Sequence, residues 1–412
     1  MIRVLAPLIV PPHMSVSGGA RAGEQLSFAL AQQCRMSVAS MLATADVAPV
    51  DAAGVSRVPV RTWLPPGLPW SRLPQRYRTL FYRSDIPDRI RPGAFDLIHL
   101  HNPMPALEME RVARAARRAG IPYLVSTHGF NEIANGRTVY GFDRLRGEVW
   151  RRLVENPVRR VVRGASAILA LSPADFSILD GMGYQGPIHV ASNGVAGGAA
   201  HDPEAEAAIR HKFNLPACSP DTLTCLFLAN HTPNKGLPIL LEAFRSLTIP
   251  YRLIVAGDTR PEIDYAAWRS QRPDQHLVVT GRLADADVAP MMRSADLFVF
   301  PTLADTLPLV VLEAMAEGIP VLASAIGGIP YQLEGGCGVL VPPGDAPALA
   351  EAVARIAANP AKRAEMGSRA RARVAQHFTW EAAATNALRA YEQVLAGQPD
   401  WNEIPLALDD AA

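Results

Sequence analysis

The chain has 412 residues, of which 49% are hydrophobic and 19% are charged, and its net charge is +1. This length predicts two or three domains, and the hydrophobic fraction supplies ample core, so the expected class is soluble globular. No apolar run reaches about 18 residues, and the opening MIRVLAPLIVPP is too short and too broken by proline for a signal peptide or membrane span. We expect it to form the first buried strand.

The cysteines indicate the redox compartment of the protein, and the charge distribution indicates its partners. The four cysteines, Cys34, Cys218, Cys225 and Cys337, are widely spaced without C-x-x-C, which indicates a reducing cytosol and argues against a zinc site. Residues 1–195 carry a net charge of +9 and the remainder −8. A basic half favours an anionic membrane surface or a polyanionic acceptor, and an ordinary solvated arginine face is the alternative. The expected localisation is cytoplasmic, including the inner face of the membrane.

The most concentrated basic patch lies between residues 70 and 91. It combines Arg72, Arg76, Arg78, Arg83, Arg89 and Arg91 with Trp70, Tyr77, Phe81 and Tyr82. No nucleic-acid motif accompanies these residues, so we do not expect nucleic acid as a partner.

The first part of the chain begins with strand-like IRVLAPLIV, a turn at Ser15–Gly19 and a helix predicted over Ala22–Gln33. This order suits a phosphate, because glycine lets the backbone approach an oxyanion closely. The fingerprint G-x-G-x-x-G is absent, which removes the main support for an NAD enzyme. The following elements are strands at 95–103, 121–127, 166–172 and 188–192, and helices at 107–119, 143–163 and 173–182. This alternation predicts a parallel sheet in a Rossmann-like domain that closes near residue 195.

Three histidines in this domain lie near strand ends. His99 and His101 form an H-x-H pair, which is either a metal site or a structural strand end; no carboxylate or third ligand accompanies it. His128 follows a strand and precedes Gly129, a position from which a side chain reaches a ligand. A lone histidine is, however, more often a satisfied core group.

Residues 196–203 are the predicted linker to a second domain at 203–378. Its strand LTCLFLAN ends in the loop NHTPNKG (Asn230 to Gly236), and later strands end at Gly257-Asp258 and Gly281-Arg282. Helices are predicted at 204–212, 238–246, 262–270, 285–293, 346–357, 360–376 and 379–395, strands at 251–258, 276–282 and 296–300, and a strand and loop at 338–345. The tail, 397–412, is expected to be mobile.

The segment Pro301–Pro330, PTLADTLPLVVLEAMAEGIPVLASAIGGIP, organises the second domain. Thr306 suits an N-cap, Pro308 a first-turn position, and Leu309–Ala316 a helix that Gly318 closes. This helix starts beyond the carboxyl end of a strand, where open α/β sheets bind ligands, and its free N–H groups suit an anion, most simply a phosphate.

Two acidic residues accompany this helix. Asp305 precedes it and Glu313 lies eight residues later, so the two carboxylates can bracket a ligand. Glu313 stands in an otherwise apolar helix, which argues against a solvated face and leaves a structural hydrogen bond as the alternative.

These segments resemble family 4 glycosyltransferases of the GT-B class over about residues 1–396. Asp305 and Glu313 match a D-x7-E variant of the family's E-x7-E motif, in which the first acid contacts the donor sugar and the second the nucleotide ribose. Lys235 matches the motif that binds the donor diphosphate. Gly18-Gly19, the D-x-x-H-x-H segment at His99 and His101, and the T-H-G element at His128 also match. The resemblance implies two Rossmann-like domains facing each other across a cleft, with residues 381–396 crossing back to the first.

The chain departs from the family pattern at two places. Asn230 occupies the position where the family usually has an arginine that binds the diphosphate. Arg282 is a candidate to supply this missing charge. Thr306-Leu307-Pro308 stands where the family commonly has Gly-Phe-Gly, and Pro308 lacks an N–H. Because aspartate is one methylene shorter than glutamate, the sugar contact must also shift. With Leu309 of the helix start, these residues complete the expected donor site.

The resemblance implies retaining transfer of a hexosyl group from a UDP- or GDP-sugar to an acceptor hydroxyl on a glycan or lipid, as in polysaccharide synthesis. Lys235, the Gly19 region and the helix start would stabilise the leaving diphosphate, so no metal or other cofactor is required. Asp305 would position the sugar, Glu313 the ribose and His128 a sugar hydroxyl. The alternatives are a nucleotide-sugar epimerase or phosphorylase on the same scaffold, and a non-catalytic sugar-binding protein.

Overall fold

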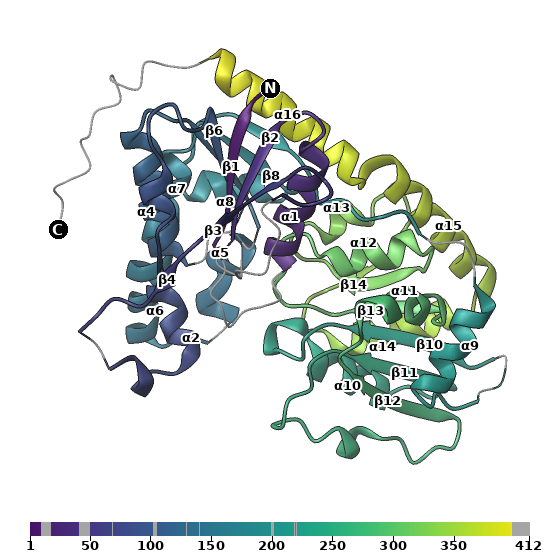
Figure 1. Cartoon of the computed structure of the whole chain (residues 1–412). Helices are drawn as coiled ribbons and strands as arrows, with labels where there is room; N and C mark the ends of the chain where they lie inside the picture. The colour runs from purple at the N-terminus through teal and green to yellow at the C-terminus, as the bar shows by residue number, and fades with distance from the viewer. Residues whose placement is uncertain are drawn as a thin grey trace. The chain divides into compact units, whose positions relative to one another are not determined.

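The computed structural model describes residues 1–9, 18–40, 50–67, 69–101, 105–128, 130–139, 141–198, 202–217, 219 and 221–397. The chain divides into two compact units, each built on its own parallel sheet (Figure 1). The first unit holds Met1–Arg137, Gly141–Ser192 and the chain from Glu381, and the second holds Asn193–Trp380. The predicted first domain ended at residue 195, three residues beyond this division.

The first unit contains a seven-stranded parallel sheet in the order β3-β2-β1-β6-β7-β8-β9. Its strands are β1 (Arg3–Leu8), β2 (Arg35–Ser40), β3 (Ser56–Pro59), β6 (Leu97–Leu100), β7 (Tyr123–Ser126), β8 (Ala167–Ala170) and β9 (Ile188–Val190). A separate antiparallel pair joins β4 (Thr62–Trp63) and β5 (Arg83–Ser84). The chain places β2 and β3 on one side of β1 and continues with β6 on the other. The sheet therefore has a switch point between β1 and β6.

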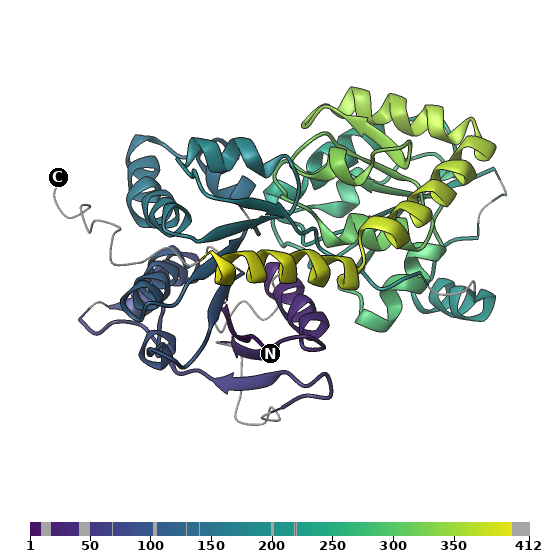
Figure 2. The same cartoon turned by 90° about the horizontal axis from the view of Figure 1, so that it is seen from above.

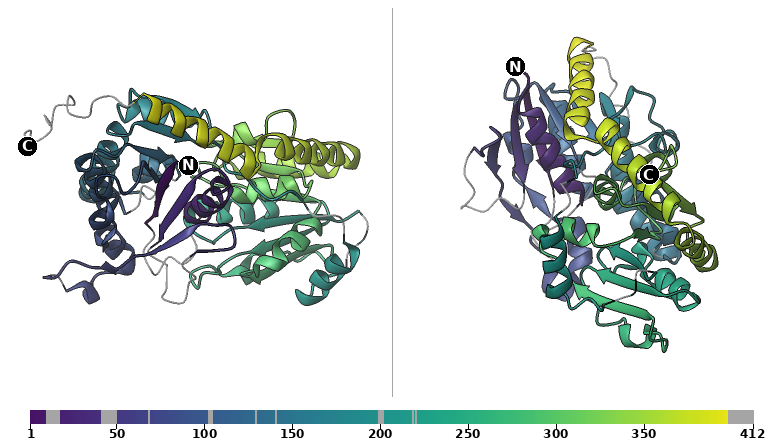
Figure 3. Two further views of the ribbon diagram at one scale, coloured as in Figure 1. Left: turned by 45° about the horizontal axis from the view of Figure 1, so that its top comes forward. Right: turned by 90° about the vertical axis from the view of Figure 1, so that its right-hand side faces the viewer.

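Helices cover both faces of this sheet. They are α1 (Gly18–Leu30), α2 (Gln75–Arg78), α3 (Ile86–Arg89), α4 (Ala106–Arg118), α5 (Phe130–Val139), α6 (Arg144–Trp150), α7 (Asn156–Arg163), α8 (Asp175–Gly181) and α16 (Trp380–Ala396), with short helical turns at Trp70–Arg72, Thr79–Phe81 and Arg151–Glu155. Leu5, Ile98 and Tyr123 pack into one apolar core with residues of α4 and α7. On the other face, α1 and α16 lie side by side (Figures 1 to 3). The expected return of the C-terminal helix to the first domain is confirmed.

Two predicted helices of this unit differ from the structure. The first helix begins at Gly18 instead of Ala22, so the glycine pair forms its first turn; residues 15–17 lie outside the described part. The helix predicted over 143–163 is interrupted by a π-helical turn at Arg151–Glu155. Pro157 explains the interruption, because it has no N–H to donate to the carbonyl four residues earlier.

The second unit contains a six-stranded parallel sheet in the order β12-β11-β10-β13-β14-β15. The strands are β10 (Leu223–Leu228), β11 (Tyr251–Ala256), β12 (Gln275–Gly281), β13 (Leu297–Phe300), β14 (Val321–Ser324) and β15 (Gly338–Val341). Its helices are α9 (Pro203–Lys212), α10 (Leu237–Arg245), α11 (Asp285–Arg293), α12 (Leu309–Ala316), α13 (Ile329–Gln332), α14 (Ala346–Ala357) and α15 (Pro360–His377), with short turns at Pro233–Lys235 and Tyr265–Trp268. The switch point of this sheet lies between β10 and β13.

The central strands of both sheets are mostly apolar and are buried on both faces, as strands covered by helices on two sides must be. All residues of β11, β13 and β14 are buried, and so are those of β6, β7 and β8. Ligand-binding groups are therefore left to the loops at the strand ends. Among the described helices, none is long and apolar enough to cross a membrane.

Candidate active site

The loops that follow β10 and β13 meet at the switch point of the second sheet. Gly236 ends the first loop with φ +74°, and a Cβ there would lie 1.9 Å from the carbonyl oxygen of Pro301. The backbone N–H of Leu303 donates to the Asn234 carbonyl at 2.7 Å. Because only glycine permits this approach, the G of the predicted K-G pair fixes the position of Lys235.

Lys235 and Asp305, two of the predicted site residues, form an ion pair across these loops. The lysine Nζ donates to both carboxylate oxygens, at 2.7 and 2.9 Å. The Thr302 hydroxyl lies 2.6 Å from Oδ2 of Asp305, and this second partner orients the carboxylate. The side chains of Lys235 and Asp305 are 23% and 16% exposed, so the pair is shielded but still partly reached by solvent.

The start of α12 differs from the prediction. Pro308, with φ −66° and ψ 124°, is the N-cap, so Thr306 is not the cap and Pro308 is not in the first turn. The Thr306 carbonyl accepts from the Gly328 N–H at 2.6 Å, so the following loop holds this backbone in place. The side chains of Thr306 and Leu307 are buried beneath the helix start, whereas Leu309 is half-buried.

Glu313 lies one turn beyond Leu309 on the same side of α12. Both are half-buried, while Val311, Leu312, Ala314 and Met315 are buried in the core. The helix therefore presents its first free N–H groups and one carboxylate near the same edge of the sheet. This arrangement suits a ligand with an anionic part and a hydroxylated part.

A third loop, after β14, closes on the second. Gly327 has φ +56°, and a Cβ there would lie 2.0 Å from the Asp305 carbonyl oxygen. The Gln332 side chain donates to the Pro308 carbonyl at 3.0 Å, and that of Asn193 to the Leu307 carbonyl at 3.3 Å. The site is supported by Thr302, Asn193 and Gln332, which were not predicted from the sequence. The sequence signal for a close approach of these loops was the pair Gly327-Gly328.

The remaining predicted donor residues of this unit, Asn230 and Arg282, are exposed. Asn230 follows β10 and Arg282 follows β12, which is separated from β10 by β11. Both lie at the carboxyl edge, but the structure pairs neither of them with Lys235 or Asp305 among the described contacts. Next to Asn230, burial lowers the pKa of His231, whose Nδ1 lies 2.5 Å from the Tyr265 hydroxyl.

In the first unit, Gly18 and Gly19 start α1, and His128 follows β7. A Cβ on Gly18 would have none of the described neighbours within 4 Å. His128 is 5% exposed, and burial lowers its pKa to about 4. The imidazole is therefore neutral at pH 7 and has one N–H donor and one acceptor nitrogen.

Asp175, which was also not predicted from the sequence, supports the His128 loop. Its carboxylate accepts from the Thr127 hydroxyl and from the Leu171 N–H, the latter at 2.9 Å. Burial raises the pKa of Asp175 to about 6, and these hydrogen bonds oppose the rise. The capping-box spacing of Ser172 and Asp175 was the sequence signal for this role.

The H-x-H pair has no metal geometry. The two ring nitrogens of His99 lie 2.7 Å from the hydroxyls of Tyr391 and Ser126, which occupies both of them. Among the described residues, no three histidine, cysteine, aspartate or glutamate side chains gather as ligands. His99 is thus a structural residue at the strand end.

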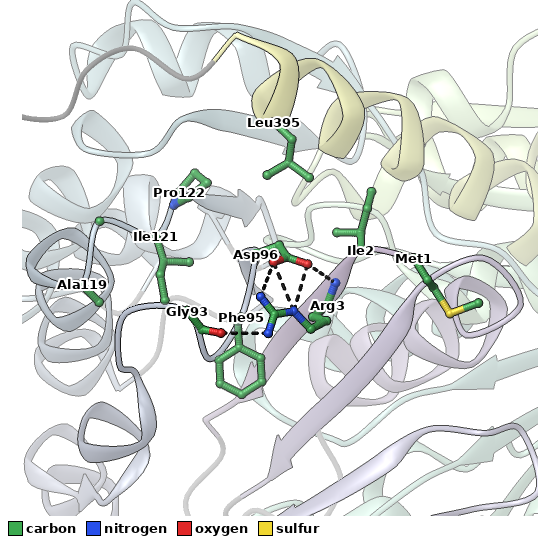
Figure 4. Close-up of a pocket in the computed structure, with 11 residues that line it drawn as sticks. Met1, Ile2, Arg3, Gly93, Phe95, Asp96, Ala119, Ile121, Pro122 and Leu395 are labelled. Atoms are coloured by element: carbon green, nitrogen blue, oxygen red, sulfur yellow. Dashed lines mark hydrogen bonds and ion pairs between the residues drawn. The ribbon is translucent and has the colours of Figure 1, made fainter.

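The hollow shown in Figure 4 lies at the opposite edge of the first sheet. It is bordered by the amino ends of β1, β6 and β7 and by Leu395 of α16. Arg3 spans it with an ion pair to Asp96 at 2.5 Å and a hydrogen bond to the Gly93 carbonyl. Because ligands of open α/β sheets bind at the carboxyl edge, this hollow is not the candidate site.

Two parallel-sheet units with their polar loops at the switch points define a GT-B glycosyltransferase fold. Sucrose-phosphate synthase from Thermosynechococcus elongatus superposes with a TM-score of 0.72 over 96% of this chain and 99% of that one, at 21% identity. The Anabaena protein HepE in complex with UDP-glucose has a TM-score of 0.70 over 95% and 100%, at 18% identity. At these identities the likeness shows the fold.

Sequence comparison gives the family. The model of Glycosyltransferase Family 4 matches residues 16–196, and that of Glycosyl transferases group 1 matches residues 222–359. The chain belongs to family 4 of the glycosyltransferases. It is 29% identical to the D-inositol 3-phosphate glycosyltransferase of Streptomyces avermitilis over 331 residues, which is 73% of this chain and 66% of that protein. The chain thus spans slightly less than two thirds of that relative's length.

Proposed function

We propose that this chain transfers a hexosyl group from a UDP- or GDP-linked sugar to an acceptor hydroxyl, with retention of anomeric configuration and without a metal ion or other cofactor. The Lys235–Asp305 pair beside the start of α12 is the observation that carries the proposal. A cation and free helix N–H groups are what a diphosphate leaving group requires. The UDP-glucose bound by HepE and the inositol phosphate in the relative's name support the donor and acceptor classes.

The proposed reaction breaks the bond from the sugar C1 to the diphosphate oxygen and forms one from C1 to the acceptor oxygen. The acceptor proton passes to the leaving phosphate on the same face, so no protein nucleophile is assigned. Lys235 neutralises the diphosphate charge, while Asp305 holds the lysine and positions the sugar. Glu313 binds the ribose, and the neutral His128 bonds a sugar hydroxyl. Arg282 and the glycines of α1 are further candidates for diphosphate contact.

A thermal-shift screen against UDP- and GDP-sugars tests the donor. A ligand at about 100 times its Kd stabilises a protein by about 2.7 kcal/mol, so one donor class should raise the melting temperature. Glu313→Ala should abolish this rise and Lys235→Ala should weaken it. Unchanged shifts in both variants would contradict the assigned roles.

A product assay with the same donors tests the reaction. We expect free nucleoside diphosphate and a glycosylated product when an acceptor panel that includes myo-inositol phosphate is supplied. An altered sugar nucleotide without acceptor would indicate an epimerase, and a released sugar phosphate would indicate a phosphorylase. Donor binding without turnover across the panel would indicate a non-catalytic protein.

We further propose contact with anionic lipid through α6. The arginines of the predicted 70–91 patch are partly engaged: Arg78 donates to the Leu73 carbonyl, and Arg89 pairs with Asp85. What distinguishes α6 is its exposed apolar side chains: Leu145 is 75% exposed and Val149, one turn later, is 45% exposed. Arginines at 144, 146, 151 and 152 flank them and are exposed, although Arg146 pairs with Asp143, and Arg151 and Arg152 pair with Glu148. An apolar stripe with basic flanks is typical of helices that lie in a membrane interface.

A further inference from the structure

The first unit contains a buried histidine that has no role in the reaction as proposed. His101 directly follows β6 and is 0% exposed. Neither of its ring nitrogens has a hydrogen-bond partner among the described residues. Burial keeps bulk water away, so none of the described residues and no bulk water satisfies these nitrogens. Such groups are rare in native proteins because leaving one unpaired lowers the stability of the fold.

The surroundings hold the His101 ring in place. It stacks on His99 with ring centroids 3.7 Å apart, and the hydroxyls of Tyr391 and Ser126 fix His99. On the α1 side, the backbone of Gly23 comes so close that an added Cβ would lie 2.8 Å from Cγ of His101. His101 is therefore packed between neighbours that do not satisfy its nitrogens.

The position of His101 in the sheet is that of a ligand-binding residue. It directly follows β6 at the switch point between β1 and β6, beside the helix that Gly18 and Gly19 begin. Its ring centroid lies 6.2 Å from that of His128, which follows the neighbouring strand β7. Burial lowers the pKa of both histidines, so each is neutral and has one donor and one acceptor nitrogen.

We propose that His101 is a further substrate-binding residue, whose free imidazole nitrogen forms a hydrogen bond with a hydroxyl group of the sugar or of a polyol acceptor beside His128. This inference rests on the proposed sugar transfer. It explains why an unsatisfied imidazole is retained at the carboxyl edge: substrate supplies the missing partner. The neighbouring His99 has the same burial on the same strand but has both partners, and it belongs to the scaffold.

The test compares His101→Phe with the wild-type full-length chain. Phenylalanine keeps a flat ring against His99 and removes both nitrogens. We expect a higher melting temperature, because an unsatisfied group is lost, and a roughly three- to tenfold lower kcat/KM, because a substrate hydrogen bond is lost. His101→Gln returns a hydrogen-bonding amide and should recover part of the activity. His99→Phe is the control for the stability effect, and it should lower the melting temperature because two buried hydroxyls lose their partner.

His101→Leu, which is narrower, replaces the phenylalanine variant where the close approach of Gly23 prevents folding. A higher melting temperature with unchanged kcat/KM would overturn the proposal. A lower melting temperature together with lower activity in both variants would also overturn it, because His101 would then have a structural partner.

A binding measurement separates this inference from the proposed function. The imidazole 15N signals of His101 should move on addition of UDP-glucose or myo-inositol, while those of His189 on the distant edge strand β9 stay in place. Wild-type protein without transfer activity would contradict the proposed function alone. Unmoved His101 signals with every donor and polyol would contradict the role of His101.

Discussion

At the scale of single residues, the donor side of the site depends on the balance between two partners of Lys235. Its Nζ lies 2.7 Å from Oδ1 of Asp305, in a setting only partly shielded from water. An exposed or half-exposed ion pair contributes little net stability, because solvation of the separate charges competes with it. A diphosphate brings more negative charge than one carboxylate does. The pair can therefore hold the lysine in place without blocking the donor.

Removal of the Lys235 charge should weaken donor binding and leave the fold intact. A charge-assisted hydrogen bond contributes about 1.5–3 kcal/mol, so Lys235→Ala should raise the donor Kd roughly ten- to hundredfold. Lys212→Ala is the matched control, because Lys212 also bonds both oxygens of an aspartate, Asp287, at 2.9 and 2.7 Å, but on α9. Calorimetric titration with the donor found by thermal shift measures both. Equal Kd values for the two variants would contradict the assigned role.

At the scale of elements, the donor site is made of three loops that glycines lock together. Gly236 and Gly327 each have a positive φ. A Cβ added to Gly236 would lie 1.9 Å from a backbone carbonyl oxygen of a neighbouring loop, and one added to Gly327 would lie 2.0 Å from such an oxygen. A side chain at either position must therefore displace a neighbouring loop. Since these loops carry Lys235 and Asp305, displacement changes the site as well as stability.

Gly236→Ala and Gly327→Ala should each lower the free energy of unfolding by more than about 1–2 kcal/mol, the cost of a left-handed alanine alone. Both should also weaken donor binding. Gly335→Ala is the control, because Gly335 has φ +76° but no neighbouring atom would lie within 4 Å of its added Cβ. It should show only the conformational cost and normal donor affinity. Urea unfolding and donor titration give the two quantities, and control-like behaviour of all three variants would refute the interlocking.

The proposed lipid contact belongs to a single helix, α6. Leu145→Ser should weaken binding to vesicles that contain anionic lipid, because it removes the most exposed apolar side chain of the stripe. Leu340→Ser on β15 is the control, since Leu340 is also exposed, at 40%, but lies in the second unit. Vesicle co-sedimentation measures both variants at low and moderate salt. Equal loss, or no binding by the wild type, would contradict the contact.

The sequence predicted the bounds of α11, α12 and α14 as the structure has them, but not the start of α1 or the N-cap of α12. Alternating apolar strands and helices indicated both sheets, and the D-x7-E spacing placed Asp305 in the loop before α12 and Glu313 inside that helix. The N-cap at Thr306 was wrong because the Thr306 carbonyl bonds to Gly328, a contact between loops far apart in sequence. The start of α1 and the partners of His99 likewise depend on tertiary packing. Local propensity contains no information about such contacts.

At the scale of the whole molecule, the same solution appears in each unit. A parallel sheet buries its strands, so chemistry is confined to the loops at the carboxyl edge, and both sheets place their candidate residues next to a switch point. The units differ in what they place there. The second unit has a charged pair, Lys235 and Asp305, whereas the first has uncharged, buried imidazoles. This difference predicts that acid affects the two units differently.

Acidification should destabilise the protein through the first unit. Burial lowers the pKa of His99 to about 3 and of His128 to about 4, and that of His101 well below its usual value. Between about pH 6.5 and pH 4 these groups are neutral when folded and protonated when unfolded, so unfolding takes up protons and stability falls as the pH falls. His128 alone accounts for about 3 kcal/mol, at about 1.4 kcal/mol for each unit of pKa.

Asp175 acts in the opposite direction. Its pKa is raised to about 6 in the folded state, so its contribution to stability is complete below about pH 4 and is lost as the pH rises through 6. The loss of stability from protonating three histidines exceeds the gain from this one carboxyl. The melting temperature should therefore fall steadily from pH 7 to pH 4. Asp175→Asn removes the offset and should steepen the fall. Hydrogen exchange on β6 and β7, compared with β11 and β13, assigns the loss to the first unit. A flat or rising melting temperature over this range would show that the buried imidazoles do not govern the acid response.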